Sequence, residues 1–259
     1  MRNKSLRPLK ILSIDFDFFQ NVKKETLYTY PDGHDLGTDM SVFVWAHHYA
    51  NPFECKLLEE VSVNQKLFDE MKEIIISNKS DDVDKPTMVA NSHMHIYDFI
   101  VNNYDSKKHN GIDIVNIDMH HDMFNDNPKL DCGNWINHIT ERFPNYQLTW
   151  IANPISEEMY GFGEKIKHYV KTDFDSIKDK QFDIIFLCRS DTWLPPHLDN
   201  KFDELYHCII KNYYNVLVDK QIVKPREYKE AAEAQRKAFE EFEAFRKAQK
   251  EAKKETKDE

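Results

Sequence analysis

Short apolar runs alternate along this chain with segments whose apolar residues recur at helical spacing. Runs rich in β-branched residues predict strands at residues 9–14, 87–90, 112–117, 146–151 and 182–188. Helical spacing predicts helices at 64–77, from 96 onward and at 197–213, and residues 131–139 predict a turn that enters a helix. Strands that alternate with helices favour a three-layer α/β/α fold with a mainly parallel sheet.

The pattern changes at residue 226. Residues 226–259 contain no glycine or proline, and their 10 basic and 10 acidic residues balance. An apolar stripe predicts a long amphipathic C-terminal helix; it consists of Tyr228, Ala231, Ala238, Phe239, Phe242 and Phe245. We therefore expect an α/β domain at 1–225 and a helical tail at 226–259. This tail could dock on its own domain or on another subunit, which would make a homo-oligomer.

Composition excludes several classes of function. The 259 residues suffice for one domain with an appendage, and the net charge of -10 disfavours a nucleic-acid-binding protein. The 6 glycines form no phosphate-binding motif. An acidic surface is compatible with a cationic substrate or partner.

The cysteines and the N-terminus indicate a cytoplasmic protein. Cys55, Cys132, Cys188 and Cys208 are widely spaced, so neither a zinc ribbon nor a disulfide framework is indicated. The N-terminus lacks an apolar signal core and no apolar run reaches membrane-spanning length, so no membrane partner is expected.

The most informative stretch is Asp118-Met-His-His-Asp122, directly after the strand at 112–117. Along an extended backbone, alternation would point Asp118, His120 and Asp122 to one side and His121 to the other. Carboxylates mixed with imidazole suit a divalent ion such as Mn²⁺, Zn²⁺ or Fe²⁺.

Three other strands also end in candidate ligands. Asp15 and Asp17 follow the first strand, His93 (or its competitor His95) follows the strand at 87–90, and Asp191 follows the strand at 182–188. In parallel sheets, functional residues gather beyond the carboxyl ends of the strands. Six candidate ligands result, which is about the number that two divalent ions sharing carboxylates require; they are Asp15, Asp17, His93, Asp118, His120 and Asp122.

Such a pair of ions can activate a water for attack on an amide, a phosphoester or a guanidinium. Asp191 could bind a cationic substrate through paired hydrogen bonds. His138, or whichever of His95 and His121 is not a ligand, could transfer a proton to the leaving amine.

These motifs resemble the arginase and deacetylase superfamily. His93, Asp118-x-His120-x-Asp122 and Asp15-x-Asp17 match its ligands to two manganese ions. The segments around Asn116–Met123, Gly133-Asn134-Trp-Ile and Ile14–Phe19 resemble a branch that includes peptide arginases of ribosomal peptide pathways. The resemblance implies a Mn²⁺ enzyme that converts arginine residues of a precursor peptide to ornithine and releases urea, with Asp191 and Asn134 binding the substrate.

One departure from that family is the order of the motifs, because Asp-x-Asp precedes Asp-x-His-x-Asp here, as if the fold were permuted. Asp191 could then be a metal ligand instead of the guanidinium acceptor. The alternatives are a single-metal amide hydrolase or deacetylase of the same fold, and a non-catalytic protein that binds a partner through its tail.

Overall fold

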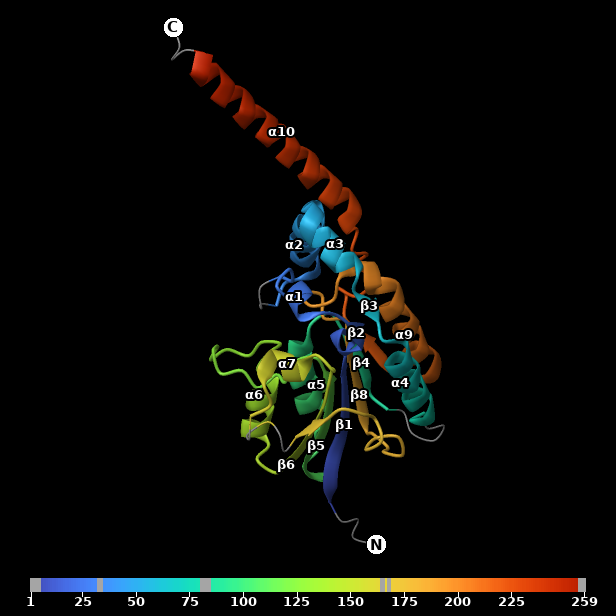
Figure 1. The fold of residues 1–259 in the computed structure, drawn as a ribbon. Coiled ribbons are helices and arrows are strands. Elements are labelled where there is room, and N and C mark those ends of the chain that lie inside the picture. The colour runs from blue at the N-terminus through green and yellow to red at the C-terminus, as the bar shows by residue number, and fades with distance from the viewer. Residues whose placement is uncertain (1–5, 32–34, 80–84, 164–165, 167–168, 256–259) are drawn as a thin grey trace.

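The core of the protein is a seven-stranded parallel sheet with strand order β7-β6-β5-β1-β8-β4-β9. The structure is a computed structural model that describes residues 6–31, 35–79, 85–163, 166 and 169–255 (Figure 1). The strands are β1 (Arg7–Asp15), β4 (Thr87–Ala90), β5 (His109–Asp118), β6 (Tyr146–Ala152), β7 (Val170–Lys171), β8 (Ile184–Cys188) and β9 (Val216–Val218). A separate antiparallel ribbon joins β2 (Gln20–Asn21) to β3 (Ser62–Val63).

Helices cover both faces of the sheet, which confirms the predicted α/β class with three layers. The helices α4 (Gln65–Ser77) and α9 (Asp199–Asn212) pack on one face. The helices α5 (Ile96–Asn103) and α6 (Trp135–Arg142) pack on the other, beside α7 (Ser156–Tyr160) (Figure 1). Asn64 caps α4 by accepting a hydrogen bond from the amide of Leu67.

Alternation along β1 divides the core in two. Leu12 and Ile14 contribute to the cluster beneath α4 and α9, whereas Leu9 and Ile11 contribute to the cluster beneath α5 and α6. Ser13 follows Ile11 on the second face and is fully buried there. A polar side chain at this depth needs a hydrogen-bonding partner.

Three helices lie beyond the carboxyl ends of the strands, and the sequence pattern did not predict them. They are α1 (Lys24–Leu27), α2 (Thr38–Ala50) and α3 (Pro52–Glu59) (Figure 1). The face that α2 buries includes Thr38 and Ser41 beside Trp45, so it lacks the continuous apolar stripe that reveals a helix.

The predicted C-terminal helix is present as α10 (Tyr228–Glu255). Its first turns pack on α2, and the rest of the helix projects away from the body (Figure 1). Arg226, just before it, is buried and donates hydrogen bonds to the carbonyls of Asp191 and Leu194. The boundary predicted at residue 226 thus falls where the chain is still attached to the α/β body.

The cysteines are all unpaired, in agreement with their wide spacing. Across the part of the chain that the structure describes, every helix is too short or too polar to cross a lipid bilayer. The charge pattern at 78–85 predicts a linker, and residues 80–84 of it lie outside the described residues.

Candidate metal centre

The carboxyl end of β1 supplies two buried carboxylates. Asp15 is the last residue of the strand, and Asp17 lies in the 3-10 helix Phe16–Phe19. The Asp15 carboxylate caps this helix by accepting a hydrogen bond from the Asp17 amide (3.2 Å). The period-2 spacing of Asp15 and Asp17 predicts that both side chains share one side of an extended strand, and this prediction is wrong because the strand ends at Asp15. A tight helical turn, not strand alternation, brings the two carboxylates to the same end of the sheet.

The neighbouring strand β5 ends at Asp118, and the backbone is not extended beyond it. Asp122 has a φ of 51°, in the left-handed region that aspartate adopts more readily than most residues. The loop still points Asp118, His120 and Asp122 toward one site, but strand alternation is not the reason. The backbone amide of His120 donates a hydrogen bond to Asp118 Oδ1 at 2.7 Å, which fixes this part of the loop.

His93 reaches this site from the loop after β4, where it begins a 3-10 helix at His93–His95. Its ring stacks on Phe186 of β8 and lies beside Trp135 of α6, with ring centroids 5.6 and 5.2 Å apart, respectively. The His93 Nε2 atom lies 2.6 Å from Ser13 Oγ. A proton on Nε2, donated to Ser13, leaves the lone pair of Nδ1 free.

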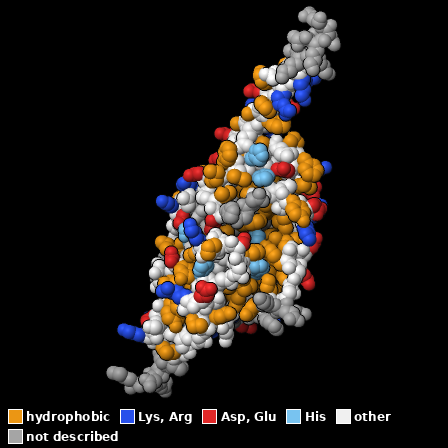
Figure 2. Space-filling model, turned by 90° about the vertical axis from the view of Figure 1, so that its left-hand side faces the viewer, with side chains coloured by type: hydrophobic (Ala, Val, Ile, Leu, Met, Phe, Trp, Pro, Cys, Tyr) orange, Lys and Arg blue, Asp and Glu red, His pale blue; other side chains and the backbone are white. Residues whose placement is uncertain are grey.

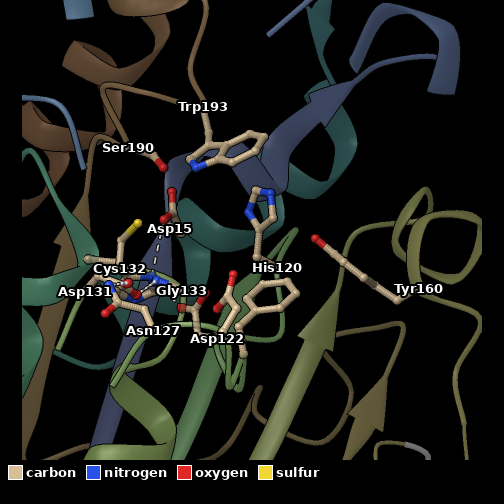
Figure 3. A pocket seen from close by; sticks show the side chains of 13 residues that line it. Asp15, His120, Asp122, Asn127, Asp131, Cys132, Gly133, Tyr160, Ser190 and Trp193 are labelled. Carbon is tan, nitrogen blue, oxygen red and sulfur yellow. Dashed lines mark hydrogen bonds and ion pairs between the residues drawn. The ribbon is translucent and has the colours of Figure 1, made fainter. Parts of the chain in front are cut away.

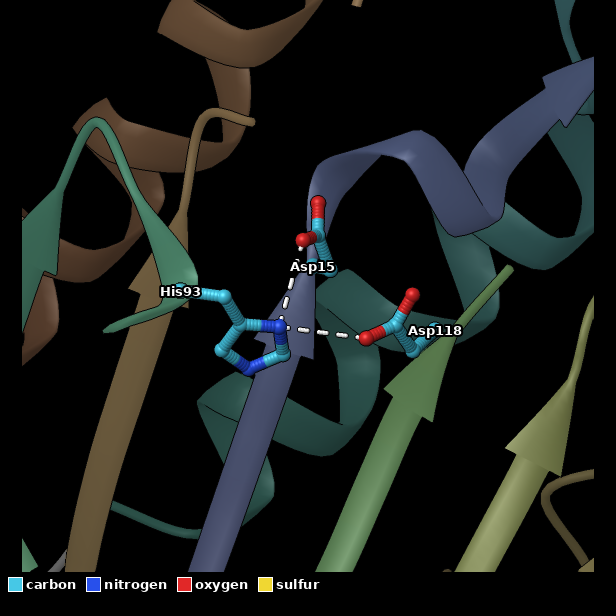
Figure 4. A group of neighbouring side chains, drawn as sticks. All are labelled: Asp15, His93 and Asp118. Carbon is cyan, nitrogen blue, oxygen red and sulfur yellow. Dashed lines mark ion pairs between the residues drawn. The ribbon is translucent and has the colours of Figure 1, made fainter. Parts of the chain in front are cut away.

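The Nδ1 atom of His93 points into a cluster of carboxylates (Figure 4). It lies 3.2 Å from Asp15 Oδ2, 3.1 Å from Asp118 Oδ2 and 3.0 Å from Asp122 Oδ2. It has no hydrogen-bonding partner despite its burial. Asp15, His93 and Asp118 thus bring three potential ligand atoms together, as a cation site does. Asp122 lies beside them, and its Oδ2 also accepts a hydrogen bond from Trp135 Nε1 at 2.6 Å.

A second group lies on the other side of Asp118. His120 Nδ1 is 2.9 Å from Asp17 Oδ2 and 3.6 Å from Asp118 Oδ1. The Asp17 Oδ2 and His120 Nε2 atoms are buried without a hydrogen-bonding partner. Asp118 thus turns one oxygen toward each histidine, as a carboxylate that bridges two ions does. The buried residues Asp15, Asp17, His93, Asp118 and His120 could hold metal ions.

Burial and mutual repulsion disfavour the ionised form of most of these carboxylates when no cation lies between them. Burial, and then the charge of Asp15, raises the pKa of Asp17 from 3.8 to about 8. Burial and the Asp118 charge likewise raise the pKa of Asp15 and of Asp122. Burial opposes ionisation of Asp118, but the neighbouring imidazoles of His120 and His93 outweigh it and lower the pKa of Asp118. Four ionised carboxylates would carry a charge of -4, which two divalent cations would neutralise.

A cavity of about 370 Å³ opens onto the cluster (Figure 3). Asp15, His93, His120 and Asp122 form its floor. Its walls consist of Phe124, Asp126, Asn127, Asp131, Cys132, Gly133, Tyr160, Ser190 and Trp193. This volume is in the range of small-molecule sites, roughly 300–1,000 Å³.

The sequence interpretation missed the aromatic wall. The Trp193 ring lies 4.5 Å from the His120 ring, and the Tyr160 hydroxyl points toward His120 (Figure 3). Tyr160 ends α7, and Gly161 follows with a φ of 57°, a left-handed helix end that glycine favours. The sequence indicates these two residues only weakly: Trp193 comes just after the strand that ends near Asp191, and Tyr160 is followed by glycine.

Ser190 was also missed, and its backbone is strained. It has a φ of 59° although it is not glycine. It is 7% exposed and its hydroxyl lies at the cavity wall (Figure 3). Strained backbone of this kind concentrates at functional sites, where the surrounding structure maintains it.

The Asp191 carboxylate does not face the cavity, as a residue that binds the substrate there would. Its Oδ1 accepts from Arg189 Nε at 2.5 Å, and its Oδ2 accepts from Arg189 Nη2 at 3.0 Å and from Thr38 Oγ1 at 2.6 Å. It is absent from the described residues that line the cavity. We therefore correct both expectations for Asp191, as guanidinium acceptor and as metal ligand, because Arg189 already neutralises its carboxylate.

The other predicted partners also lie outside the cavity lining in the described residues. The Asn134 amide is fully used in the loop before α6: it accepts from the Asp131 amide and donates to the carbonyls of Asn127 and Lys129. His138 is partly buried on α6. His121 packs on Phe124 and Tyr160. Asn134 is thus a loop-organising residue, and His138, His95 and His121 are not among the described residues that line the cavity.

Comparison of the chain with protein-family models, with curated proteins and with solved structures finds no match. The assignment of function therefore depends on the site itself.

Proposed function

We propose that the protein is a binuclear metal hydrolase of guanidinium groups, with Mn²⁺ as its metal. On this proposal it converts arginine residues of a peptide to ornithine and releases urea. The observation that carries the proposal is the division of the cluster into two groups, each with its own histidine, that share Asp118.

The donor atoms fit a pair of Mn²⁺ ions. Carboxylates and imidazoles together suit Mn²⁺, whereas thiolates, which favour softer ions, are not among the six candidate ligands. His93, Asp122 and Asp15 would hold one ion, and His120 and Asp17 the other, with Asp118 between them. When bound, the ions supply an activated water and stabilise negative charge that develops on the substrate.

The walls of the cavity suit a planar cation. Trp193 offers an aromatic face next to His120, and guanidinium groups stack favourably on such faces. Asp126 is exposed at the cavity and adds negative charge that attracts a cation. Burial raises the pKa of Tyr160 to about 12, so its hydroxyl keeps its proton near neutral pH and can donate a hydrogen bond.

The reaction balances without a further reagent. Water adds its oxygen to the guanidinium carbon, and the bond from this carbon to the side-chain nitrogen breaks. Both protons of the water end on that nitrogen, which leaves as an ammonium group while the carbon departs in urea. The cavity would position the guanidinium between the aromatic wall and the carboxylate floor.

The deciding experiment measures urea and metal content together. Protein supplied with Mn²⁺ should release urea from arginine-containing peptides, and mass spectrometry should find ornithine in the product. Metal analysis should find two ions per chain. A single bound zinc ion together with amide hydrolysis would instead support the one-metal alternative. Absence of urea from every peptide and from free arginine would contradict the proposal, and absence of bound metal would favour the non-catalytic alternative.

A further inference from the structure

The apolar stripe of α10 is covered on one part of the helix and bare on the next. Near the start of α10, Tyr228, Ala231 and Ala232 pack against Trp45 and Tyr49 of α2. The Gln235 side chain is the last of this docked part and reaches the Phe43 carbonyl of α2 at 3.4 Å. From residue 236 to 250 every side chain is exposed.

The bare part still has large hydrophobic side chains. Phe239, Phe242 and Phe245 are 65%, 56% and 59% exposed. Figure 1 shows this part of α10 projecting beyond the body, and Figure 2 shows hydrophobic side chains continuing onto it. Phe43 of α2, at the base of the projection, is also 60% exposed. We call residues 236–250 the arm. An exposed apolar stripe of this kind marks an interaction surface.

The spacing of the stripe is that of a coiled coil. If Tyr228 is placed at heptad position a, Phe242 also falls at a, and Ala231, Ala238 and Phe245 fall at d. The stripe thus begins on the face that packs on α2 and continues along the arm as far as Phe245. The face that docks on the body is therefore the same face that a second helix would cover.

Polar residues occupy the other two a positions, which are Gln235 and Gln249. Gln235, one heptad before Phe242, contacts α2 and precedes the arm, whereas Gln249, one heptad after Phe242, lies within it. A polar side chain at a single a position costs some stability but fixes the register and the number of helices, because it pairs best with its own equivalent. Phe239 falls at e, beside the stripe, and widens the apolar face in the middle of the arm.

The charges beside the stripe select the partner. In the same frame Glu241 occupies position g and Arg246 occupies position e. In a parallel pair of helices, g of one helix lies beside the following e of the other, so a second copy of this chain would pair Glu241 with Arg246 twice. An antiparallel pair would place g beside g and e beside e, and these ion pairs would be lost.

We propose that the arm pairs in parallel with the arm of a second copy of this chain, forming a homodimer. Six phenylalanine side chains would be covered in the pair. Because one enclosed phenylalanine buries about 150–250 Å² and these side chains are 56–65% exposed, the six would bury roughly 500–900 Å², a large share of the ~1,000 Å² expected of a specific interface. The inference is independent of the chemistry at the metal centre.

Sedimentation of the full chain between about 1 and 100 µM tests the proposal. The expected mass is twice the 30.9 kDa of the chain. Phe242→Ser/Phe245→Ser should raise the dissociation constant at least about tenfold, since two apolar core positions are lost. The matched control, Ile76→Ser/Tyr214→Ser, removes two side chains that are 51% and 83% exposed elsewhere and should leave the dimer intact. A monomeric wild type, or a dimer that survives the arm variant, would overturn the proposal.

A charge exchange tests the parallel arrangement. Glu241→Lys and Arg246→Glu should each weaken the homodimer, because each places like charges side by side. An equimolar mixture of the two variants should associate more tightly than either alone, since every g and e pair is then of opposite sign. A mixture that associates no better than its components would overturn the parallel arrangement. Circular dichroism of each variant checks that the body is folded.

Discussion

Ser13 Oγ lies 2.6 Å from Nε2 of His93, and both side chains are buried beneath the carboxylate cluster. The contact fixes which nitrogen of the ring faces the carboxylates. A residue in the middle strand thus sets the orientation of a candidate ligand that arrives from a different segment of the chain.

Ser13→Ala should therefore weaken metal binding without unfolding the protein. Partners that orient a metal-binding histidine are typically worth about 10–100-fold in affinity. Titration of metal-free protein with Mn²⁺ measures the change. Ser41→Ala is the matched control, because Ser41 is equally buried but bonds the Asp191 carbonyl instead. Equal affinities in the two variants would contradict the role of Ser13.

Asp118→Asn should remove metal from both groups at once, because Asp118 is the residue that they share. Metal content by mass spectrometry should fall from two ions per chain to less than one. Asp113→Asn is the control: Asp113 lies on the same strand, is buried and pairs with Lys180 at 2.8 Å, away from the cluster. If Asp118→Asn kept its full metal content, the proposed centre would be wrong.

The metal-free protein should lose stability as the pH rises. The pKa of Asp17 is raised from 3.8 to about 8 in the folded chain, so between these values the folded state binds a proton that the unfolded state has released. Each such proton lowers the free energy of unfolding by at most about 1.4 kcal/mol per pH unit. The raised pKa of His93 and of His120 acts in the same direction above their usual pKa.

Denaturant unfolding of chelator-treated protein at several pH values between 4 and 8 measures this slope. Asp17→Asn should flatten it, and Mn²⁺ should reverse it, because the cation replaces the protons and binds more tightly as they leave. A metal-free protein that becomes more stable toward pH 8 would be inconsistent with the buried carboxylates.

Two variants of Ser190 can distinguish the effect of its strained backbone from the effect of its hydroxyl group. Ser190→Ala and Ser190→Gly both remove the hydroxyl at the cavity wall, but only glycine relieves the φ of 59°. We expect both variants to release urea more slowly than the wild type. The free energy of unfolding of the glycine variant should exceed that of the alanine variant by about 1 kcal/mol. Equal stabilities would show that the backbone there is not strained.

Asp126 should affect substrate binding more than turnover. Because this exposed carboxylate lies at the cavity but is not part of the cluster, Asp126→Asn should raise KM for a cationic peptide and leave kcat nearly unchanged. Asp69→Asn, an exposed position on α4, is the control. The effect should diminish at high salt, since screening weakens attraction between exposed charges. An unchanged KM would place substrate recognition elsewhere.

The sequence could predict where the site lies because of the parallel sheet. Residues at and just beyond the carboxyl ends of β1, β4 and β5 meet at one edge, and Asp15, His93 and Asp118 do so. It could not predict how the loops turn. Asp17 arrives through a 3-10 helix and Asp122 through a left-handed residue, and neither has a periodic signal.

The sequence does contain a feature that argues against a ligand role for Asp191. Arg189 lies two residues before it, close enough for the two side chains to pair, and burial makes such a pairing strongly favourable for the carboxylate. Trp193 and Tyr160 could not be placed in advance, because their approach to His120 depends on tertiary packing.

The place of β1 in the sheet has a consequence for folding. It precedes the other strands of the sheet along the chain but lies in the middle, where Leu12 pairs with Val115 on one side and with Ile185 on the other. Pairings so distant along the chain form slowly, and one edge of the strand stays open until β5 has been made and the other until β8 has been made. A nascent or truncated chain that ends before β8 has no complete sheet to seat Asp15 and Asp17, so tight metal uptake would report that folding has finished.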